Sequence, residues 1–100
     1  MLIPFNQPTE LEKSVLYLRE AAHSGLVRGD GIFCRKCSEW IEKQFDARRA
    51  LLTPSCSHSL EMAAILCDVR PGDEIIMPSF TFCSTANAFV LRGAHIVQVN

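Results

Sequence analysis

The second half of the chain alternates short apolar runs with longer segments of helical character, and this alternation limits the possible folds more than any other feature. Three apolar runs are predicted strands, 49–53, 74–78 and 95–99, and the segments between them, 57–68 and 81–92, are predicted helices. Strands alternating with helices of this length indicate a parallel sheet of β-α-β-α-β order. We therefore expect an α/β fold with ligands bound outside the carboxyl ends of its strands.

The first half of the chain has a helical pattern instead. Residues 9–24 are the first predicted helix, because Thr9 to Glu12 fits a capping box in which the two side chains accept free backbone N–H groups. An apolar stripe recurs at spacings of three and four residues, and we expect it to face a core: Leu11, Val15, Leu18 and Ala22. Gly25 then stands where the end of a helix favours a left-handed residue.

A glycine-rich loop, 25–31, leads to a second helix, predicted over about 32–46. One face of this helix gathers Phe33, Cys37, Trp40, Ile41 and Phe45. The change of pattern divides the chain into an N-terminal helical segment with its loop, 1–48, and the start of an α/β domain, 49–100. Three parallel strands would leave sheet edges and a sheet face uncovered, so we expect the 100 residues to be a fragment of a larger domain.

Composition argues against several classes of function. The formal net charge is −1 and the ten basic residues are scattered, so we expect no nucleic-acid or anionic-membrane partner. The longest stretch without a charge, 75–91, is too polar to span a membrane. The N-terminus lacks the regions of a signal peptide. Five cysteines without a repeated spacing fit reduced thiols, which predicts a cytoplasmic protein.

The turn between the first predicted strand and its helix, 54–59, is small and polar. The first N–H groups of a helix have no partner inside it and carry partial positive charge, so they stabilise a phosphate without a cationic side chain. Ser57 can add a hydroxyl donor, and Ser57 and His58 both offer backbone N–H groups. The alternative is that Ser55 or Ser57 only caps the helix. We expect His58 to contribute through its backbone rather than as a catalytic imidazole.

The turn after the second predicted strand, 78–87, would lie beside the first turn in a parallel sheet. It contains two aromatic residues, Phe80 and Phe82, whose rings should point in different directions. A flat ring at this place could cover the face of a planar cofactor, and we select Phe82 for that role. The alternative is that both rings belong to the core.

The two turns and their spacing resemble the DegT/StrS-like sugar-nucleotide aminotransferases. The resemblance rests on the runs Leu52 to Ala64, Pro71 to Phe82 and Ser84 to Ala94, together with Ile3-Pro4-Phe5-Asn6 and the loop 25–31. It covers nearly the whole chain, and within the family these motifs look like those of the transaminases of enterobacterial common antigen synthesis. The sequence departs from the family at Ser57-His58, where many members carry Thr-Ala, and at Asn100, where Asp often ends the third strand.

This resemblance implies a fold-type I enzyme that depends on pyridoxal 5'-phosphate (PLP). It implies transfer of an amino group from L-glutamate to the 4-keto carbon of a dTDP-4-keto-6-deoxyhexose, for a cell-surface polysaccharide, by a homodimer with active sites at the subunit interface. It also implies that Ser57 and His58 hold the PLP phosphate and that Phe82 stacks on the pyridine ring. The loop near the active-site entrance contains the expected substrate-loop residues Gly29, Asp30 and Gly31.

The family's lysine that forms the Schiff base with PLP, and the aspartate that pairs with the pyridinium nitrogen, lie beyond Asn100. The lysines of this chain are in the two N-terminal helical segments and match no family motif: Lys13, Lys36 and Lys43. We therefore assign no catalytic residue and expect the 100 residues to be inactive alone. The alternative is a non-catalytic remnant, or an interaction fragment, that keeps only the phosphate turn or an interface.

A metal or redox module built on Cys34 and Cys37 is a third hypothesis. Zinc would need two more ligands, and a thioredoxin-like motif should follow a strand directly. This pair lies inside a predicted helix instead, with Cys37 expected toward the core and Cys34 at its edge. We therefore expect no metal site of this kind.

Overall fold

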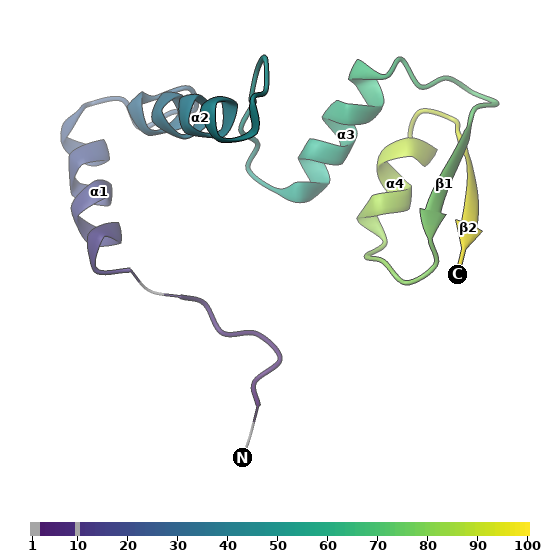
Figure 1. The fold of residues 1–100 in the computed structure, drawn as a ribbon, viewed down its shortest axis with the longest axis horizontal. Helices are drawn as coiled ribbons and strands as arrows, with labels where there is room; N and C mark the ends of the chain where they lie inside the picture. The colour runs from purple at the N-terminus through teal and green to yellow at the C-terminus, as the bar shows by residue number, and fades with distance from the viewer. Residues whose placement is uncertain (1–2, 10) are drawn as a thin grey trace. The chain divides into compact units, whose positions relative to one another are not determined.

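The computed structural model of the chain describes residues 3–9 and 11–100 (Figure 1). The chain divides into two compact units, Met1–Ala50 and Leu51–Asn100, which we call unit 1 and unit 2. Within the described residues, no helix combines the length and the apolar character needed to cross a bilayer. The predicted functional division after residue 48 stays a prediction.

Unit 1 contains two helices, α1 (Glu12–His23) and α2 (Ile32–Phe45). They meet through aromatic rings, since the centroids of Tyr17 and Phe33 lie 5.4 Å apart with the rings tilted. The Lys36 ammonium lies 5.2 Å from the centroid of the Phe33 ring and 3.8 Å from a carboxylate oxygen of Glu20. Gly25 has a φ of 69°, as the helix-end pattern predicts.

Two predictions about α1 are wrong. The helix begins at Glu12, with Leu11 as its N-cap and no side-chain capping bond, so Thr9 lies outside the helix and caps nothing. Glu10 of the predicted capping box lies outside the described residues. The apolar stripe does not face a core either, because Leu11, Val15 and Leu18 are each more than half exposed. Helical periodicity identifies a face that can be buried, but burial also needs a surface that packs against it.

The predicted inner face of α2 is also partly wrong. Cys37 is exposed and Cys34 is partly buried, which reverses the expected order. Trp40 and Phe45, on the same predicted inner face, are also largely exposed. Of that predicted face, Phe33 and Ile41 are partly buried, and Phe33 is the residue that contacts Tyr17 of α1.

Unit 2 contains α3 (Cys56–Leu66), β1 (Glu74–Pro78), α4 (Ser84–Val90) and β2 (His95–Val99), in that order. The two strands are parallel, with Glu74 opposite His95 and Pro78 opposite Val99. Both strands agree with the sequence prediction, because each is an apolar run bounded by turn residues. Helices α3 and α4 pack against each other, and α4 packs against β2.

The first predicted strand, 49–53, is absent from the structure. A strand needs a neighbour for its N–H and C=O groups, and the sheet contains only β1 and β2 among the described residues. The N–H of Ala50 instead donates to a carboxylate oxygen of Glu42 at 2.9 Å. Leu51 and Leu52 are 63% and 45% exposed, so this run is not buried either. The observed order of unit 2 is therefore α-β-α-β.

The core of unit 2 is built from small residues. Ala64 of α3 is completely buried, and it packs with Val69 and Ala94, against which Ile75 and Phe89 are partly buried. Leu60 and Ala63 of the same helix are partly buried, whereas its C-cap, Cys67, is exposed. Small side chains let helices and strands approach closely, which explains how a short unit obtains a packed centre.

A turn holds together the segments that lead into the amino-terminal ends of β1 and β2. The Asp73 N–H donates to the Arg70 carbonyl at 3.1 Å, and the Gly72 N–H donates to the Gly93 carbonyl at 3.3 Å. Gly93 has a φ of +84°, and a Cβ there would lie 2.9 Å from Cγ of Pro71. Only glycine combines this backbone conformation with so close an approach.

Candidate functional site

The N-terminus of α3 is capped by Ser55. Its backbone is extended, and its hydroxyl accepts the N–H of His58 at 3.3 Å while lying 2.7 Å from Nδ1 of the same residue. The first helical bond runs from the Ser59 N–H to the Ser55 carbonyl, at 3.1 Å. Of the two serines considered as caps, Ser55 is the one that the structure places in that position.

This cap changes which N–H groups are open to a ligand. In the first turn of a helix, the N–H groups have no acceptor inside the helix, and in α3 these belong to Cys56, Ser57 and His58. Because Ser55 takes the N–H of His58, the two open groups are those of Cys56 and Ser57. Sequence reasoning missed Cys56, whose backbone contribution follows only once the cap is known.

A second pair of hydroxyl groups supports the same turn. The Thr53 hydroxyl donates to the Ser55 carbonyl at 2.9 Å, and it also hydrogen-bonds to the Ser59 hydroxyl. These bonds hold residues 53–59 in one conformation around the start of α3. The resemblance included these residues as part of a motif, but no sequence pattern paired Thr53 with Ser59.

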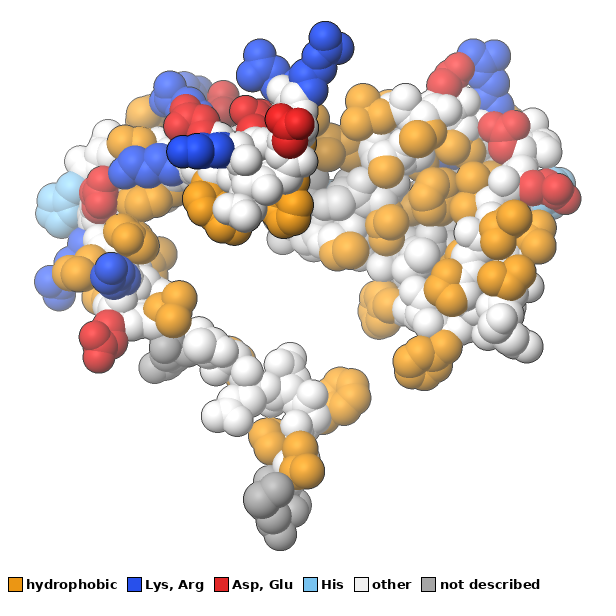
Figure 2. Space-filling view, viewed as in Figure 1, with side chains coloured by type: hydrophobic (Ala, Val, Ile, Leu, Met, Phe, Trp, Pro, Cys, Tyr) orange, Lys and Arg blue, Asp and Glu red, His pale blue; other side chains and the backbone are white. Residues whose placement is uncertain are grey.

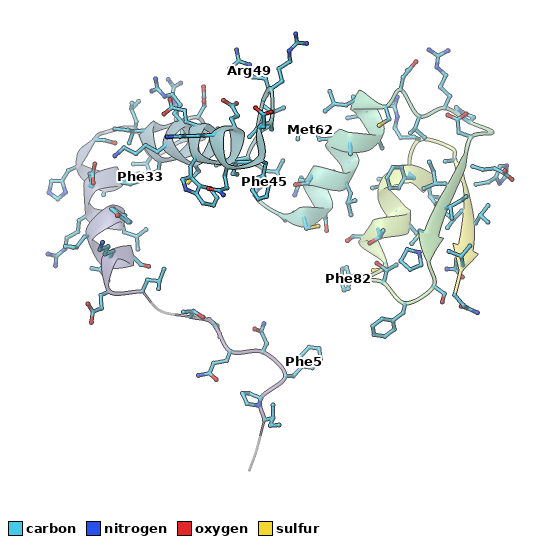
Figure 3. The ribbon with its side chains drawn as sticks, viewed as in Figure 1. Phe5, Phe33, Phe45, Arg49, Met62 and Phe82 are labelled. Carbon is cyan, nitrogen blue, oxygen red and sulfur yellow. The ribbon has the colours of Figure 1, made fainter. Side chains whose placement is uncertain are left out.

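The turn after β1 presents the two phenylalanines to solvent. Phe80 is 99% exposed and Phe82 is 74% exposed, so neither ring belongs to the core of unit 2. The Phe82 carbonyl accepts the N–H of Thr85 at 2.9 Å, which fixes the backbone of Phe82 at the start of α4. In Figure 3 the Phe82 ring extends beside that start, away from the two strands.

Both turns lie at one end of unit 2. In Figure 1 the arrowheads of β1 and β2 point toward the end at which α3 and α4 begin. The N–H of Ser79, just after β1, donates to the Val99 carbonyl at 2.9 Å, and the Ser79 hydroxyl donates to Asn100 at 2.7 Å. The carboxyl ends of the strands therefore sit with the helix N-termini, as expected for ligand sites on parallel sheets.

This end of unit 2 carries no side-chain charge of its own. The segments 51–60 and 75–91 contain no Asp, Glu, Lys or Arg. In Figure 2 the charged side chains of unit 2 gather instead where α3 passes into β1, the region of Asp68, Arg70 and Asp73. A phosphate at the start of α3 would thus meet neutral N–H and O–H donors, and an aromatic ring lies nearby for a planar group. The donor set fits a phosphorylated planar cofactor.

The predicted substrate loop forms a hollow within unit 1. The hollow has a volume of about 320 Å³, and its wall includes the loop residues Leu26 to Gly29 and the first turn of α2 from Gly31. Asp30 has a φ of 62°, a left-handed conformation that Asp adopts more readily than most residues. Gly31 is the N-cap of α2. The assignments of Gly29, Asp30 and Gly31 to a substrate stay predictions.

The described residues contain no cluster of three or more His, Cys, Asp or Glu side chains placed to hold a metal ion. The five cysteines are free thiols. A closed zinc site needs four ligands, so Cys34 and Cys37 do not make one within residues 3–9 and 11–100.

Comparison with known proteins identifies relatives of nearly the whole chain. GDP-perosamine synthase of Escherichia coli O157:H7 is 26% identical over 98 residues, which are 98% of this chain and 27% of that protein. The aminotransferase TlmJ from Streptoalloteichus hindustanus is 30% identical, with a TM-score of 0.84 over 98% of this chain and 27% of TlmJ. This chain therefore spans about a quarter of the length of these relatives.

A third relative supports the fold. Spr1654 from Streptococcus pneumoniae, described as a sugar aminotransferase, is 24% identical, with a TM-score of 0.87 over 97% of this chain and 24% of Spr1654. It has been solved in a PLP form and a PMP form. The predicted α/β fold of PLP-dependent transferases is confirmed, as is PLP as the cofactor of this family.

The family model of the DegT/DnrJ/EryC1/StrS aminotransferases matches residues 8–100, which include both turns and the loop 25–31. The chain belongs to the DegT/DnrJ/EryC1/StrS aminotransferase family.

Proposed function

We propose that the protein carrying this chain transfers the amino group of L-glutamate to the 4-keto carbon of a dTDP-4-keto-6-deoxyhexose. The enzyme we propose is a dTDP-4-amino-4,6-dideoxygalactose transaminase, which serves enterobacterial common antigen synthesis. Membership of the aminotransferase family supports the reaction class. The sugar and its nucleotide rest on the resemblance of the motifs around Ser57 and Phe82.

One observation carries the proposal. The uncharged donors at the start of α3 and the exposed ring of Phe82 lie at the same end of unit 2. The backbone N–H groups of Cys56 and Ser57 and the Ser57 hydroxyl would hold the PLP phosphate. The N–H of His58 joins them only if the Ser55 hydroxyl releases it, and their 3.3 Å separation is long for such a bond. Phe82 would cover one face of the ring.

PLP, when bound, supplies an electron sink through which an amino group passes between two substrates. The residues of this chain bind and orient, and none of them moves the proton. Lys13 and the two lysines of α2, Lys36 and Lys43, lie outside unit 2. None of the three matches the family's lysine motif, so in this proposal the lysine that completes the reaction would come from outside residues 1–100.

The remaining parts of the proposal concern substrate and assembly. We assign Gly29, Asp30 and Gly31 to the entrance of the sugar site, because their loop lines the hollow of unit 1. We propose a homodimer, in which apolar side chains of α1 that unit 1 leaves exposed would be covered. We also propose a cytoplasmic location, because the five cysteines are free thiols.

The test is an amino-transfer assay on the protein purified from its source, after its intact mass has been measured. With added PLP and L-glutamate, we expect an amino sugar from a dTDP-4-keto-6-deoxyhexose, detected by mass spectrometry, and little product from the matching GDP sugar. A preference for the GDP sugar would contradict the nucleotide assignment. An intact mass near 11.2 kDa, together with no product, would establish the non-catalytic alternative instead.

A further inference from the structure

The side chain of His58 is hydrogen-bonded to the cap of α3. Its Nδ1 atom lies 2.7 Å from the Ser55 hydroxyl, and the same hydroxyl accepts the backbone N–H of His58 at 3.3 Å. Both contacts join the N-cap of the helix to its third residue. The shorter contact holds the imidazole within the turn that supplies the open N–H groups of Cys56 and Ser57.

The bond between the two side chains survives protonation of the ring. A neutral imidazole can accept the hydroxyl hydrogen at Nδ1, whereas an imidazolium has an N–H at both nitrogens and can only donate. The hydroxyl oxygen of Ser55 has two lone pairs, so it can accept from Nδ1 and from the backbone N–H of His58 together. The protonated ring can therefore stay on Ser55, and it then adds a positive charge to the first turn of α3.

That charge would stand in surroundings that supply no other cation. The segments 51–60 and 75–91 contain no Asp, Glu, Lys or Arg, and their titratable side chains besides the imidazole are the thiols of Cys56 and Cys83. Helix α4, which packs against α3, has no titratable side chain, and the other charged residue of α3 is Glu61, one turn after the histidine. Histidine is the side chain that normally changes its charge between about pH 5 and 8.

We propose that protonated His58, held on Ser55, is the positive charge of the phosphate site, so that the cofactor phosphate binds more tightly as the pH falls and the ring gains its proton. The inference rests on the proposed binding of PLP at the start of α3. Its sign follows from linkage, because an imidazolium attracts the phosphate and a bound phosphate in turn favours the imidazolium. Where the ring is neutral, the uncharged donors hold the phosphate alone. The ring contributes to binding and takes no part in proton transfer.

The experiment is a fluorescence titration of the purified protein with pyridoxamine 5'-phosphate, at about pH 6 and about pH 8. This probe has the phosphate of PLP but no aldehyde that reacts with a lysine. A phosphate also loses negative charge as the pH falls, so the readout is the ratio of the affinities of the wild-type protein and His58→Asn at each pH. Asparagine is uncharged and can still hydrogen-bond to Ser55.

We expect the two proteins to bind the probe about equally at the higher pH. At the lower pH the wild-type protein should bind it about three- to fivefold more tightly, because a hydrogen bond from a charged donor is stronger than a neutral one, although exposure of the ring reduces the gain. His95→Asn is the matched control. His95 is an exposed histidine of the same unit at the first position of β2, away from the carboxyl ends of the strands, so its replacement should leave both affinities unchanged.

Three other results would overturn the proposal. A ratio between the wild-type protein and His58→Asn that does not change with pH would exclude His58 as the charge, although the cofactor site itself would stand. An equal change in His95→Asn would show a general effect of protein charge. Absence of binding to the wild-type protein at both pH values would contradict the proposed cofactor site as well. Circular dichroism of each variant checks that the helices remain folded.

Discussion

Unit 1 and unit 2 each contain two helices in about fifty residues, yet the side chains buried in the described structure all belong to unit 2. They are Ala64, Val69, Met77, Ala88 and Ala94. Neither α1 nor α2 buries a single residue. In unit 2, β1, α4 and β2 follow one another closely, so strand pairing brings small apolar residues from distant positions together. Unit 1 has only a contact between two helices, and amphipathic sequence there does not lead to burial.

The two units also differ in how their helices begin. Helix α3 has a side-chain cap in Ser55, whereas α1 and α2 have Leu11 and Gly31 as N-caps, without a side-chain bond. A capped and packed helix keeps its first turn in place, which suits a binding site built from backbone N–H groups. This difference favours the start of α3 in unit 2 as the proposed site of the cofactor phosphate. The loop of unit 1 keeps its proposed role in substrate entry.

The largest expected effect comes from comparing two glycines that have left-handed backbones, Gly93 of unit 2 and Gly25 of unit 1. Gly93→Ala should lower the free energy of unfolding by roughly 2–5 kcal/mol, because the left-handed conformation costs about 1–2 kcal/mol and crowding against Pro71 adds about 1–3 kcal/mol. Gly25→Ala is the matched control. It has a similar φ but open space around the new Cβ, so only the conformational cost of about 1–2 kcal/mol is expected.

Urea unfolding of the purified protein, followed by circular dichroism, measures both variants. Equal losses at the two positions would mean that the contact between Gly93 and Pro71 does not hold unit 2 together. A larger loss of unfolding free energy in Gly25→Ala would reverse the comparison, because unit 1 would then tolerate a side chain at its glycine less well than unit 2.

A second prediction separates cofactor binding from substrate binding. Phe82→Ala should lower PLP affinity by about two- to tenfold and leave stability unchanged, because an aromatic contact contributes roughly 0.5–1.5 kcal/mol and the ring is mostly exposed. Phe80→Ala, in the same turn, should leave PLP affinity unchanged. Ser57→Ala should have a smaller effect than Phe82→Ala, since backbone donors remain, with about 1 kcal/mol as the upper end.

The counterpart in unit 1 is Asp30→Ala. We expect a raised KM for the sugar nucleotide with unaltered PLP affinity, measured by the absorbance of the bound cofactor and by initial rates. If Asp30→Ala weakened PLP binding as much as Phe82→Ala, the assignment of cofactor and substrate to different units would be wrong. An unchanged PLP affinity in Phe82→Ala would exclude the stacking role.

The features that sequence predicted well are those in which local chemistry decides the outcome. Strands β1 and β2 were predictable because apolar runs lie between turn residues, and Gly25 and Gly93 mark the ends of helices. The run 49–53 has the same apolar character but no partner strand among the described residues, so it does not form a strand. Pairing is a property of two segments, and a pattern in one of them does not report it.

The candidate site shows the same division. The sequence located both polar turns, and the resemblance assigned Ser57, His58 and Phe82 to the cofactor. The sequence left open which serine caps α3, because Ser55 and Ser57 are chemically equivalent candidates two residues apart. The choice depends on the backbone of Ser55, which is extended with φ −158° and ψ 162°. Only that conformation reveals that Cys56 has an open N–H whereas His58 does not.

The smallest expected effects come from exchanging the caps of the two units. Ser55→Ala should destabilise the protein by about 1 kcal/mol through loss of the α3 cap, and Leu11→Ser should increase the helicity of α1 by supplying one. Ser55→Ala also frees the N–H of His58 for a phosphate, so PLP affinity should not fall. Urea unfolding, far-ultraviolet circular dichroism and PLP titration measure these effects in turn. A loss of PLP affinity in Ser55→Ala would show that the Ser55 hydroxyl itself binds the phosphate. The phosphate would then be held by that hydroxyl together with the N–H groups of Cys56 and Ser57.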